Sequence, residues 1–292
     1  MSYSAQSLKD FKAKHDFFIG IDSDGCVFDS MEIKHKECFT PMFIKHHNLQ
    51  AVSKYAREVW DFVNLYSKTR GANRFPALIR SLDLLRERSE VQARHVNVPS
   101  YPALEDWVNR ESKLGNATLA SEVEGGNEGL SHIKTWSDSI NEQVSDIVHG
   151  VPPFPLLKET LDKSLNRADM MVISQTPCDA LEREWAEHNI SKYVEIIAGQ
   201  EMGTKTEHLK FATFNKYDCD KILMIGDAPG DHKAAKANGV LFYPILPGNE
   251  ELSWERLYSE GLDHFFAGTY AGEYEKKLFS EFDNCLPEKP SW

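Results

Sequence analysis

Four short apolar runs alternate with helical patterns in the second half of this 292-residue chain, and this alternation constrains the fold most strongly. The runs are of strand length and lie at 170–173, 194–197, 221–225 and 240–245. Helical patterns fill the gaps between them at 178–188, 205–216 and 229–238. Proline begins the last of these helices and glycine follows it, which is the usual punctuation of helix ends. Strands that alternate with helices predict a parallel sheet with right-handed crossovers.

A fifth apolar run, FFIGI at 17–21, lies far from the other four. The intervening segment has apolar residues at helical spacing, such as Leu78, Leu82 and Leu85. We expect its helices near 31–47, 54–66, 75–89, 101–113 and 129–148, and one or two more helices in the tail at 250–292. The sequence therefore predicts an α/β protein with a Rossmann-like, three-layer parallel-sheet core at 1–29 and 153–292. A helical insertion would occupy residues 30–152.

Composition excludes several classes of partner and site. A net charge of −12 repels nucleic acid and anionic lipid, so we expect neither as a partner. The five cysteines are scattered without CxxC spacing, which favours reduced thiols over disulfides or a zinc site. The N-terminus lacks the apolar stretch of a secretion signal, and no apolar run has the ~20 residues that a membrane helix needs. We expect a cytoplasmic protein.

The segment Asp22-Ser23-Asp24-Gly25 directly follows the apolar run at 17–21. In open parallel sheets, ligands bind beyond the carboxyl ends of the strands. Two carboxylates at this position suit phosphoryl chemistry, because one can attack phosphorus while the other manages protons on the leaving oxygen. The alternative is a solvated acidic loop with a glycine turn, since an acidic chain contains such pairs by chance.

Carboxylates also follow the run at 221–225, where Asp227 occupies the position that Asp22 occupies on its own strand. Two parallel strands that bring carboxylates to one edge require a cation. Oxygen ligands of this kind suit Mg²⁺. Asp231 has two readings: a residue that supports the metal ligands, or an acid that the dipole favours in a first helical turn.

Five further residues, in three separate segments, are candidates for binding substrate. Ser174 and Gln175 follow the run at 170–173, where a hydroxyl and backbone amides could hold a phosphate oxygen, although Ser174 taken alone fits an ordinary strand-end turn better. Lys205 begins a helix, where a lysine opposes the helix dipole. Lys68 and Arg70 lie in the most basic short stretch of the chain, which is either a substrate-binding loop or a solvated linker.

These elements resemble the four motifs of the haloacid dehalogenase superfamily in order and spacing. The matching segments are FFIGIDSDGCVFDS, MMVISQT, MGTKTEHLK and ILMIGDAPGD. Cys26 stands where threonine is common, and the gap between the first two motifs is long. Only one helix and one strand fit between Ser174 and Lys205, so the resemblance implies that the helical insertion is a cap domain of the first type.

The resemblance also implies a mechanism. Asp22 would form an aspartyl phosphate, and Asp24 would protonate the leaving oxygen and then activate water. Mg²⁺ would be held by Asp22, the Asp24 carbonyl and Asp227, while Lys205 and Ser174 would steady the phosphoryl oxygens. The implied activity is hydrolysis of a small phosphorylated metabolite. Two alternatives stay open, namely a sugar-phosphate mutase with the same motifs and a non-catalytic binding protein on this fold.

Overall fold

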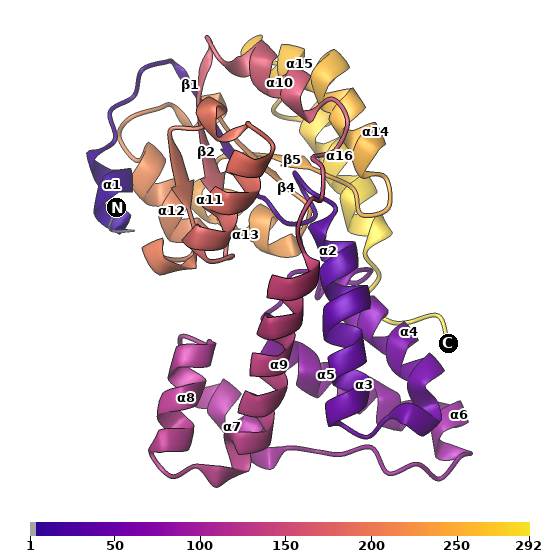
Figure 1. Cartoon of the computed structure of the whole chain (residues 1–292). Coiled ribbons are helices and arrows are strands. Elements are labelled where there is room, and N and C mark those ends of the chain that lie inside the picture. Colours follow the sequence, from indigo (N-terminus) through magenta and orange to yellow (C-terminus); the bar gives the residue numbers. More distant parts are fainter. Residues whose placement is uncertain (1–3) are drawn as a thin grey trace. The chain divides into compact units, whose positions relative to one another are not determined.

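A computed structural model describes residues 4–292 of the chain (Figure 1). The chain divides into two compact units. The core unit runs up to Ser30 and from Gly150 to Leu286, and the helical unit comprises Met31–His149 and Pro287–Trp292. The last six residues, which we expected in the core, are thus grouped with the helical unit.

The core unit is built on a parallel sheet with the strand order β3-β2-β1-β4-β5. The strands are β1 (Phe17–Ile21), β2 (Ala168–Ile173), β3 (Ile196–Ala198), β4 (Ile222–Gly226) and β5 (Leu241–Pro244). The five apolar runs therefore form the five strands, and the predicted α/β class is confirmed. The third strand begins two residues later than expected, because its pairing with β2 starts at Met171 and Ile196.

Strand β1 lies at the centre of the sheet although it comes first in the chain. In Figure 1 the indigo β1 lies beside β2 and β4, which come from much later in the sequence. Ile21 is in register with Val172 on one side and Ile225 on the other. The next backbone amide, that of Asp22, continues the pairing by donating to the carbonyl of Ile225 at 2.9 Å. The residues after β1 and β4 are thereby held at one edge of the sheet.

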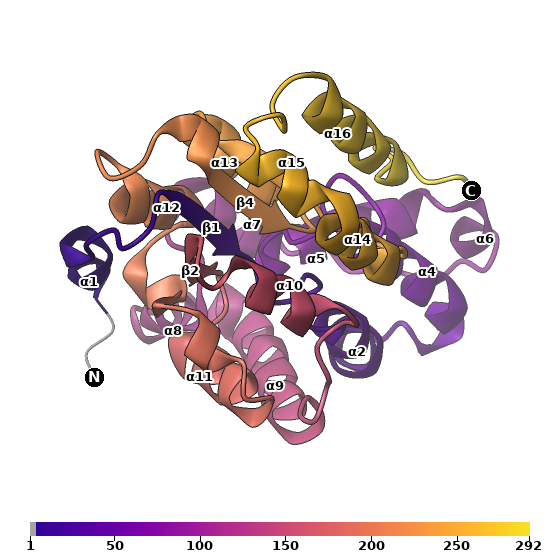
Figure 2. The ribbon, with the colours of Figure 1, turned by 90° about the horizontal axis from the view of Figure 1, so that it is seen from above.

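Both faces of the sheet are covered, so its strands consist almost entirely of apolar residues, with Asp169 in β2 as an exception. Odd-numbered β1 residues such as Ile19 and Ile21 belong to one buried cluster, together with residues of the helices that cover that face. Phe18, on the opposite face, belongs to a second cluster with residues of other helices of the core unit. Figure 2 shows helices on both sides of β1. The sheet therefore forms the middle layer of three, with a layer of helices packed on each face.

The helices that alternate with the later strands lie within a few residues of their expected positions, whereas the helix near the N-terminus was not expected and the tail forms three helices where one or two were expected. The described part of the core unit contains eight α-helices in all. They are α1 (Ala5–Asp10), α10 (Leu157–Ser164), α11 (Cys178–Glu187), α12 (Lys205–Thr213), α13 (Pro229–Asn238), α14 (Glu250–Arg256), α15 (Leu262–Phe266) and α16 (Glu273–Cys285). Pro229 begins α13, and Gly239 ends it in the left-handed region with φ 66°. Between Ser174 and Lys205 the structure has α11, β3 and two short 3₁₀ turns, which leaves no room for a further domain.

The helical unit contains no strand among its described residues. Its helices are α2 (Ser30–Ile33), which starts in the core unit, α3 (Thr40–His46), α4 (Ser53–Asn64), α5 (Arg74–Glu87), α6 (Ser89–Gln92), α7 (Pro102–Arg110), α8 (Asn116–Glu124) and α9 (Ser131–Ile147). A π-helical segment at Lys34–Phe39 joins α2 to α3, and the Thr40 hydroxyl donates to the carbonyl of His35, five residues earlier. Three tryptophans are fully buried, as expected of packing residues: Trp60, Trp107 and Trp136.

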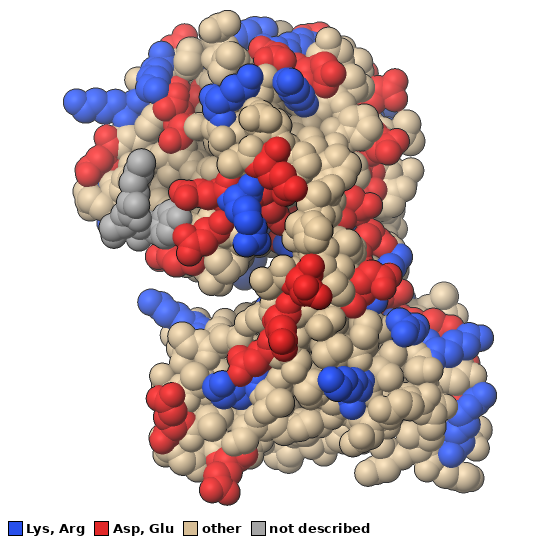
Figure 3. All heavy atoms as spheres, in the orientation of Figure 1, with Lys and Arg blue, Asp and Glu red and all other residues tan. Residues whose placement is uncertain are grey.

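No helix in residues 4–292 combines the length and apolar character needed to cross a bilayer. On the face shown in Figure 3, acidic and basic side chains are interspersed, so the negative charge of the chain is not gathered in one patch there.

Candidate active site

Asp22 directly follows β1, and its side chain is almost fully buried, with 4% exposed. The chain turns sharply two residues later, where Gly25 has a φ of 72° that other residues rarely adopt. The Gly25 amide donates to the carbonyl of Phe28 at 2.8 Å, which closes the turn. This local geometry holds the carboxylate at the edge of the sheet, as the sequence predicted.

Lys205 connects the ends of two strands. It is the first residue of α12, where Thr204 caps the helix and forms a reciprocal capping box with Glu207. The Lys205 ammonium lies 2.7 Å from Asp22 Oδ2 and 2.6 Å from Asp231 Oδ1. The lysine that opposes the helix dipole is therefore held by two buried carboxylates.

Asp227 and Asp231 complete an acidic cluster after β4. The ligand oxygens of Asp22, Asp227 and Asp231 lie within 4.8 Å of one another, and all three residues are buried. The second oxygen of Asp231 accepts a hydrogen bond from the Ala228 amide at 3.0 Å. Asp231 thus caps the start of α13, in agreement with the reading as a first-turn acid, and it also binds Lys205, while its role in supporting metal ligands stays a prediction.

Gly226 is required for this arrangement. A Cβ atom at Gly226 would lie 2.3 Å from Cγ of Asp231, closer than any ordinary contact. The last residue of β4 is thus restricted to glycine by the carboxylate that packs over its backbone.

The electrostatics of the cluster depend on burial and on close charges. Burial raises the pKa of Asp22. The positive charge of Lys205 lowers this pKa, and the negative charge of Asp231 raises it further. Burial and Asp227 likewise raise the pKa of Asp231 against the effect of Lys205. Burial alone would lower the pKa of Lys205, but Asp22 and Asp231 raise it above the ordinary lysine value. Lys205 therefore stays positively charged, whereas Asp22 and Asp231 are difficult to ionise at the same time.

Asp24 occupies a different environment from Asp22. Its side chain is only partly buried, and it accepts hydrogen bonds from the hydroxyls of Ser30 and Thr176, the latter at 2.6 Å. Its carboxylate does not belong to the group of Asp22, Asp227 and Asp231. Of the two carboxylates in the Asp-Ser-Asp segment, that of Asp22 thus pairs with an ammonium group, and that of Asp24 is held by two hydroxyls.

Two buried tryptophans hold the loop that carries these carboxylates. The indole of Trp185 donates to the Ser23 hydroxyl at 3.0 Å, and the indole of Trp254 donates to the carbonyl of Cys26 at 2.8 Å. Ser23 and Cys26 are themselves fully buried. The loop is therefore fixed by hydrogen bonds from α11 and α14 in addition to its own backbone.

Ser174 and Gln175 lie at the carboxyl end of β2, as expected. The Ser174 hydroxyl accepts a hydrogen bond from the Thr176 amide at 3.2 Å. The exposed Gln175 amide donates to the carbonyls of Ser174 and Gly203, which ties this turn to the segment before Lys205. These bonds shape the turn, and the role of both residues toward a substrate stays a prediction.

Lys68 and Arg70 lie in a turn of the helical unit. Arg70 is buried, and its guanidinium donates to the carbonyl of Leu65 at 2.9 Å. Lys68 is half-buried, and its backbone amide donates to the carbonyl of Pro287 at 3.2 Å. The Arg70 contact gives that residue a structural role, and substrate binding by either residue stays a prediction.

Sequence reasoning missed the residues that support the two carboxylates. Thr176 had one usable signal, since it is a hydroxyl residue two positions after Ser174 at the same strand end. Ser30 gave no comparable signal. Trp185 and Trp254 resemble ordinary core tryptophans in the sequence, so nothing local revealed their hydrogen bonds to the loop.

Several comparisons place the chain among known proteins. The family model for haloacid dehalogenase-like hydrolases matches residues 101–245, which include Ser174, Lys205 and Asp227. No curated protein matches the chain.

The chain is also similar to several solved structures. A predicted phosphoglycolate phosphatase from Haemophilus somnus is 15% identical with a TM-score of 0.48, over 79% of this chain and 86% of that one. A haloacid dehalogenase-like hydrolase from Xanthomonas campestris is 11% identical with a TM-score of 0.45, over 88% and 94%. With the family match and the four strand-end motifs in place, the chain belongs to the haloacid dehalogenase superfamily of hydrolases.

Proposed function

We propose that the protein is a magnesium-dependent phosphatase that hydrolyses a small phosphorylated metabolite through an aspartyl phosphate on Asp22. The proposal rests on one observation: a lysine whose side chain is only 15% exposed binds two buried aspartates of a cluster of three. With every group ionised, the three carboxylates and one ammonium carry a net charge of −2. A divalent cation would offset that charge. Without the cation, the uncompensated negative charge of these buried groups destabilises the folded state.

The donor set suits magnesium. The cluster offers only carboxylate oxygens, without histidine or cysteine, and hard oxygen ligands favour Mg²⁺ over zinc. Asp22 and Asp227 would hold the ion together with the Asp24 carbonyl. Both oxygens of Asp231 already bind other groups, which favours a supporting role for this residue. The ion would supply charge compensation for the nucleophile and the phosphoryl oxygens.

Each step then falls to a residue of the core unit. A carboxylate oxygen of Asp22 attacks phosphorus, and the bond from phosphorus to the alcohol oxygen breaks. Asp24 gives its proton to that oxygen. It then takes a proton from the water that attacks the phosphorylated Asp22, which releases phosphate and restores the carboxylate. Lys205 neutralises charge on the phosphoryl oxygens, and Ser174 would bind one of them.

A phosphate-release assay tests the proposal. We expect the purified protein to hydrolyse a generic aryl phosphate with Mg²⁺ and to lose that activity in EDTA. Asp22→Asn should abolish it, because an amide cannot serve as the nucleophile. Asp220→Asn, at an exposed aspartate that precedes β4, should retain it. Activity that survives Asp22→Asn would contradict the mechanism.

Two other functions make different predictions in the same assay. A sugar-phosphate mutase would convert one isomer of a sugar phosphate into another with little free phosphate. A binding protein would release no phosphate with any member of a metabolite panel. Rapid, Mg²⁺-dependent release across several phosphate esters favours the phosphatase over both. The panel also identifies the substrate, which we expect to be a small cytoplasmic metabolite.

A further inference from the structure

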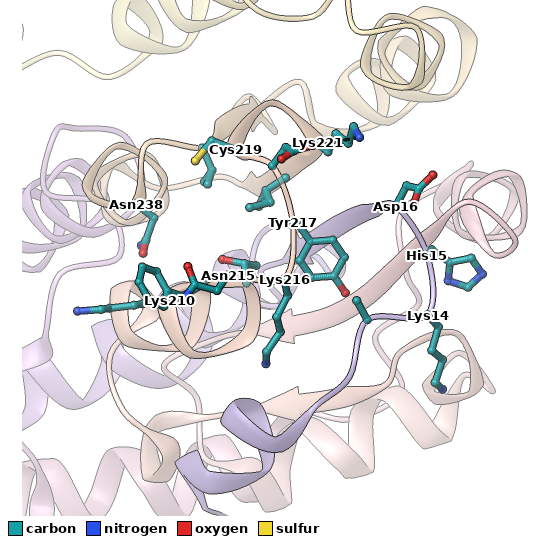
Figure 4. Close-up of a pocket in the computed structure, with 16 residues that line it drawn as sticks. Lys14, His15, Asp16, Lys210, Asn215, Lys216, Tyr217, Cys219, Lys221 and Asn238 are labelled. Carbon is teal, nitrogen blue, oxygen red and sulfur yellow. Dashed lines mark ion pairs between the residues drawn. The ribbon is translucent and has the colours of Figure 1, made fainter.

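A cavity of about 750 Å³ lies at the edge of the sheet opposite to the acidic cluster (Figure 4). Most of its lining residues lie in the segments that lead into β1, β4 and β5, at the amino ends of these strands, and the others come from the last turns of α12 and α13 and the first residue of β4. The acidic cluster lies beyond the carboxyl ends of β1 and β4. Strand β1 has five residues, which separates the two sites by roughly 16 Å at ~3.3 Å per residue.

A buried aspartate fixes one wall of this cavity. Asp169, in β2, accepts hydrogen bonds from the backbone amides of Lys14 and His15 at 2.9 and 3.1 Å. It also binds the His15 ring at 3.0 Å and the Tyr217 hydroxyl at 2.6 Å. Burial opposes ionisation of Asp169, but these hydrogen bonds, led by that of Tyr217, hold its pKa below the ordinary value. The rings of His15 and Tyr217 are thereby held in place.

Four lysines line the cavity: Lys14, Lys210, Lys216 and Lys221. Lys14 and Lys221 form ion pairs with Glu195 and Asp218. The Lys216 ammonium donates instead to two backbone carbonyls, those of Leu8 and Phe211.

In the described part of the chain, neither Lys210 nor Lys216 forms a salt bridge with a carboxylate. Figure 4 shows Lys210 on the side of the cavity opposite to Lys14 and His15, with Lys216 and Tyr217 between them. Lys210 and Lys216 are thus two cations without a salt bridge at the margin of one cavity, whose lining also includes the carboxylates of Asp16 and Asp218.

We propose that this cavity is a second binding site, distinct from the acidic cluster, for a small phosphorylated molecule. Lysine ammonium groups bind phosphate as point charges, and Lys210 and Lys216 supply them here. The ring of Tyr217 offers a fixed, flat surface for the rest of such a ligand. The cavity volume is within the ~300–1,000 Å³ that small-molecule sites occupy.

The test uses pyrophosphate as the probe, with the whole protein in EDTA. Without metal, the acidic cluster repels an anion, so binding measured by calorimetry reports the second site. We expect Lys210→Glu to weaken pyrophosphate binding at least about tenfold, which corresponds to ~1.4 kcal/mol. Lys277→Glu, at an exposed lysine of α16, should change it less than twofold. Asp22→Asn should leave the binding in place.

A labelling experiment locates the bound probe. Cys219 is exposed and lines the cavity, whereas Cys285 is half-buried and lies outside it. Pyrophosphate should slow alkylation of Cys219 in the wild type but not in Lys210→Glu, and should leave Cys285 unaffected. No binding by the wild type, or equal weakening by Lys210→Glu and Lys277→Glu, would overturn the proposal. Phosphatase activity does not enter either readout, so the two proposals fail independently.

Discussion

The hydroxyl of Thr176 donates a hydrogen bond of 2.6 Å to the carboxylate of Asp24, from a position 152 residues later in the chain. Ser30 donates to the other oxygen of the same carboxylate. In the proposed reaction Asp24 first gives and then takes a proton, so its orientation and its pKa both matter. Hydrogen bonds to the ionised form of a carboxylate lower its pKa. Thr176 is therefore expected to tune the acid and base steps without touching phosphorus.

Replacing Thr176 with valine keeps the shape of the side chain and removes the donor. We expect kcat to fall about tenfold and the acid limb of the pH–rate profile to move to higher pH, because Asp24 then ionises less readily. Thr176→Ser, which retains a hydroxyl, should remain close to the wild type. Steady-state kinetics between pH 5 and 9 distinguish these outcomes. A valine variant with an unchanged pH profile would show that the bond is only structural.

Lys205 stabilises the acidic cluster as well as serving the proposed reaction. In Lys205→Met the carboxylates of Asp22 and Asp231 lose their buried counter-charge. We expect the free energy of unfolding in EDTA to fall by ~3–5 kcal/mol, because one partner of a buried ion pair has been removed. Urea unfolding at pH 7 measures this change.

Two comparisons sharpen the Lys205 experiment. Added Mg²⁺ should restore part of the lost stability of Lys205→Met, because the ion supplies positive charge to the same carboxylates. Lys277→Met, at an exposed lysine, should change the free energy of unfolding by no more than ~0.5 kcal/mol. Equal effects of the two substitutions would argue that Lys205 is not a buried counter-ion.

The sheet and its acidic edge could be predicted because their signals are local. Each strand contains a run of apolar residues, and Asp22 and Asp227 each follow a strand directly. The supporting hydrogen bonds could not be predicted in the same way, because the contact of Thr176 with Asp24 depends on tertiary packing. Helix α8 was missed for another reason, since Leu119 is its only buried residue and its apolar residues do not gather in a clear stripe on one face.

Two glycines near the end of β4 form a matched pair for a stability test. A Cβ atom at Gly226 would lie 2.3 Å from Asp231, whereas one at Gly230, in the first turn of α13, would meet nothing within 4 Å. We expect Gly226→Ala to lower the free energy of unfolding by more than ~2 kcal/mol, through overpacking and displacement of Asp231. Gly230→Ala should be neutral or stabilising by up to ~1 kcal/mol, because alanine favours the helix. Thermal or urea unfolding of both variants measures these changes, and phosphate release is measured alongside. A Gly226→Ala variant that is as stable and active as the wild type would contradict the close packing of Asp231 against Gly226.

His47, in the helical unit, makes a pH-dependent contribution to stability. Burial, reinforced by His132 and His46, lowers the pKa of His47 from 6.5 to about 3, and its ring nitrogen Nδ1 lies 2.7 Å from the Tyr101 hydroxyl. The folded protein therefore keeps His47 neutral, while the unfolded chain binds a proton below pH 6.5. As the pH falls from 6.5 towards 3, the free energy of unfolding should drop, by at most ~1.4 kcal/mol per pH unit from this residue.

His47→Gln should lower the free energy of unfolding at neutral pH but flatten its dependence on pH between pH 4 and 6, because glutamine does not titrate. The exposed His149 provides the control, since His149→Gln should retain the wild-type slope. Urea unfolding at half-unit pH steps measures all three proteins, and an equally steep slope for His47→Gln would assign the acid sensitivity to other groups.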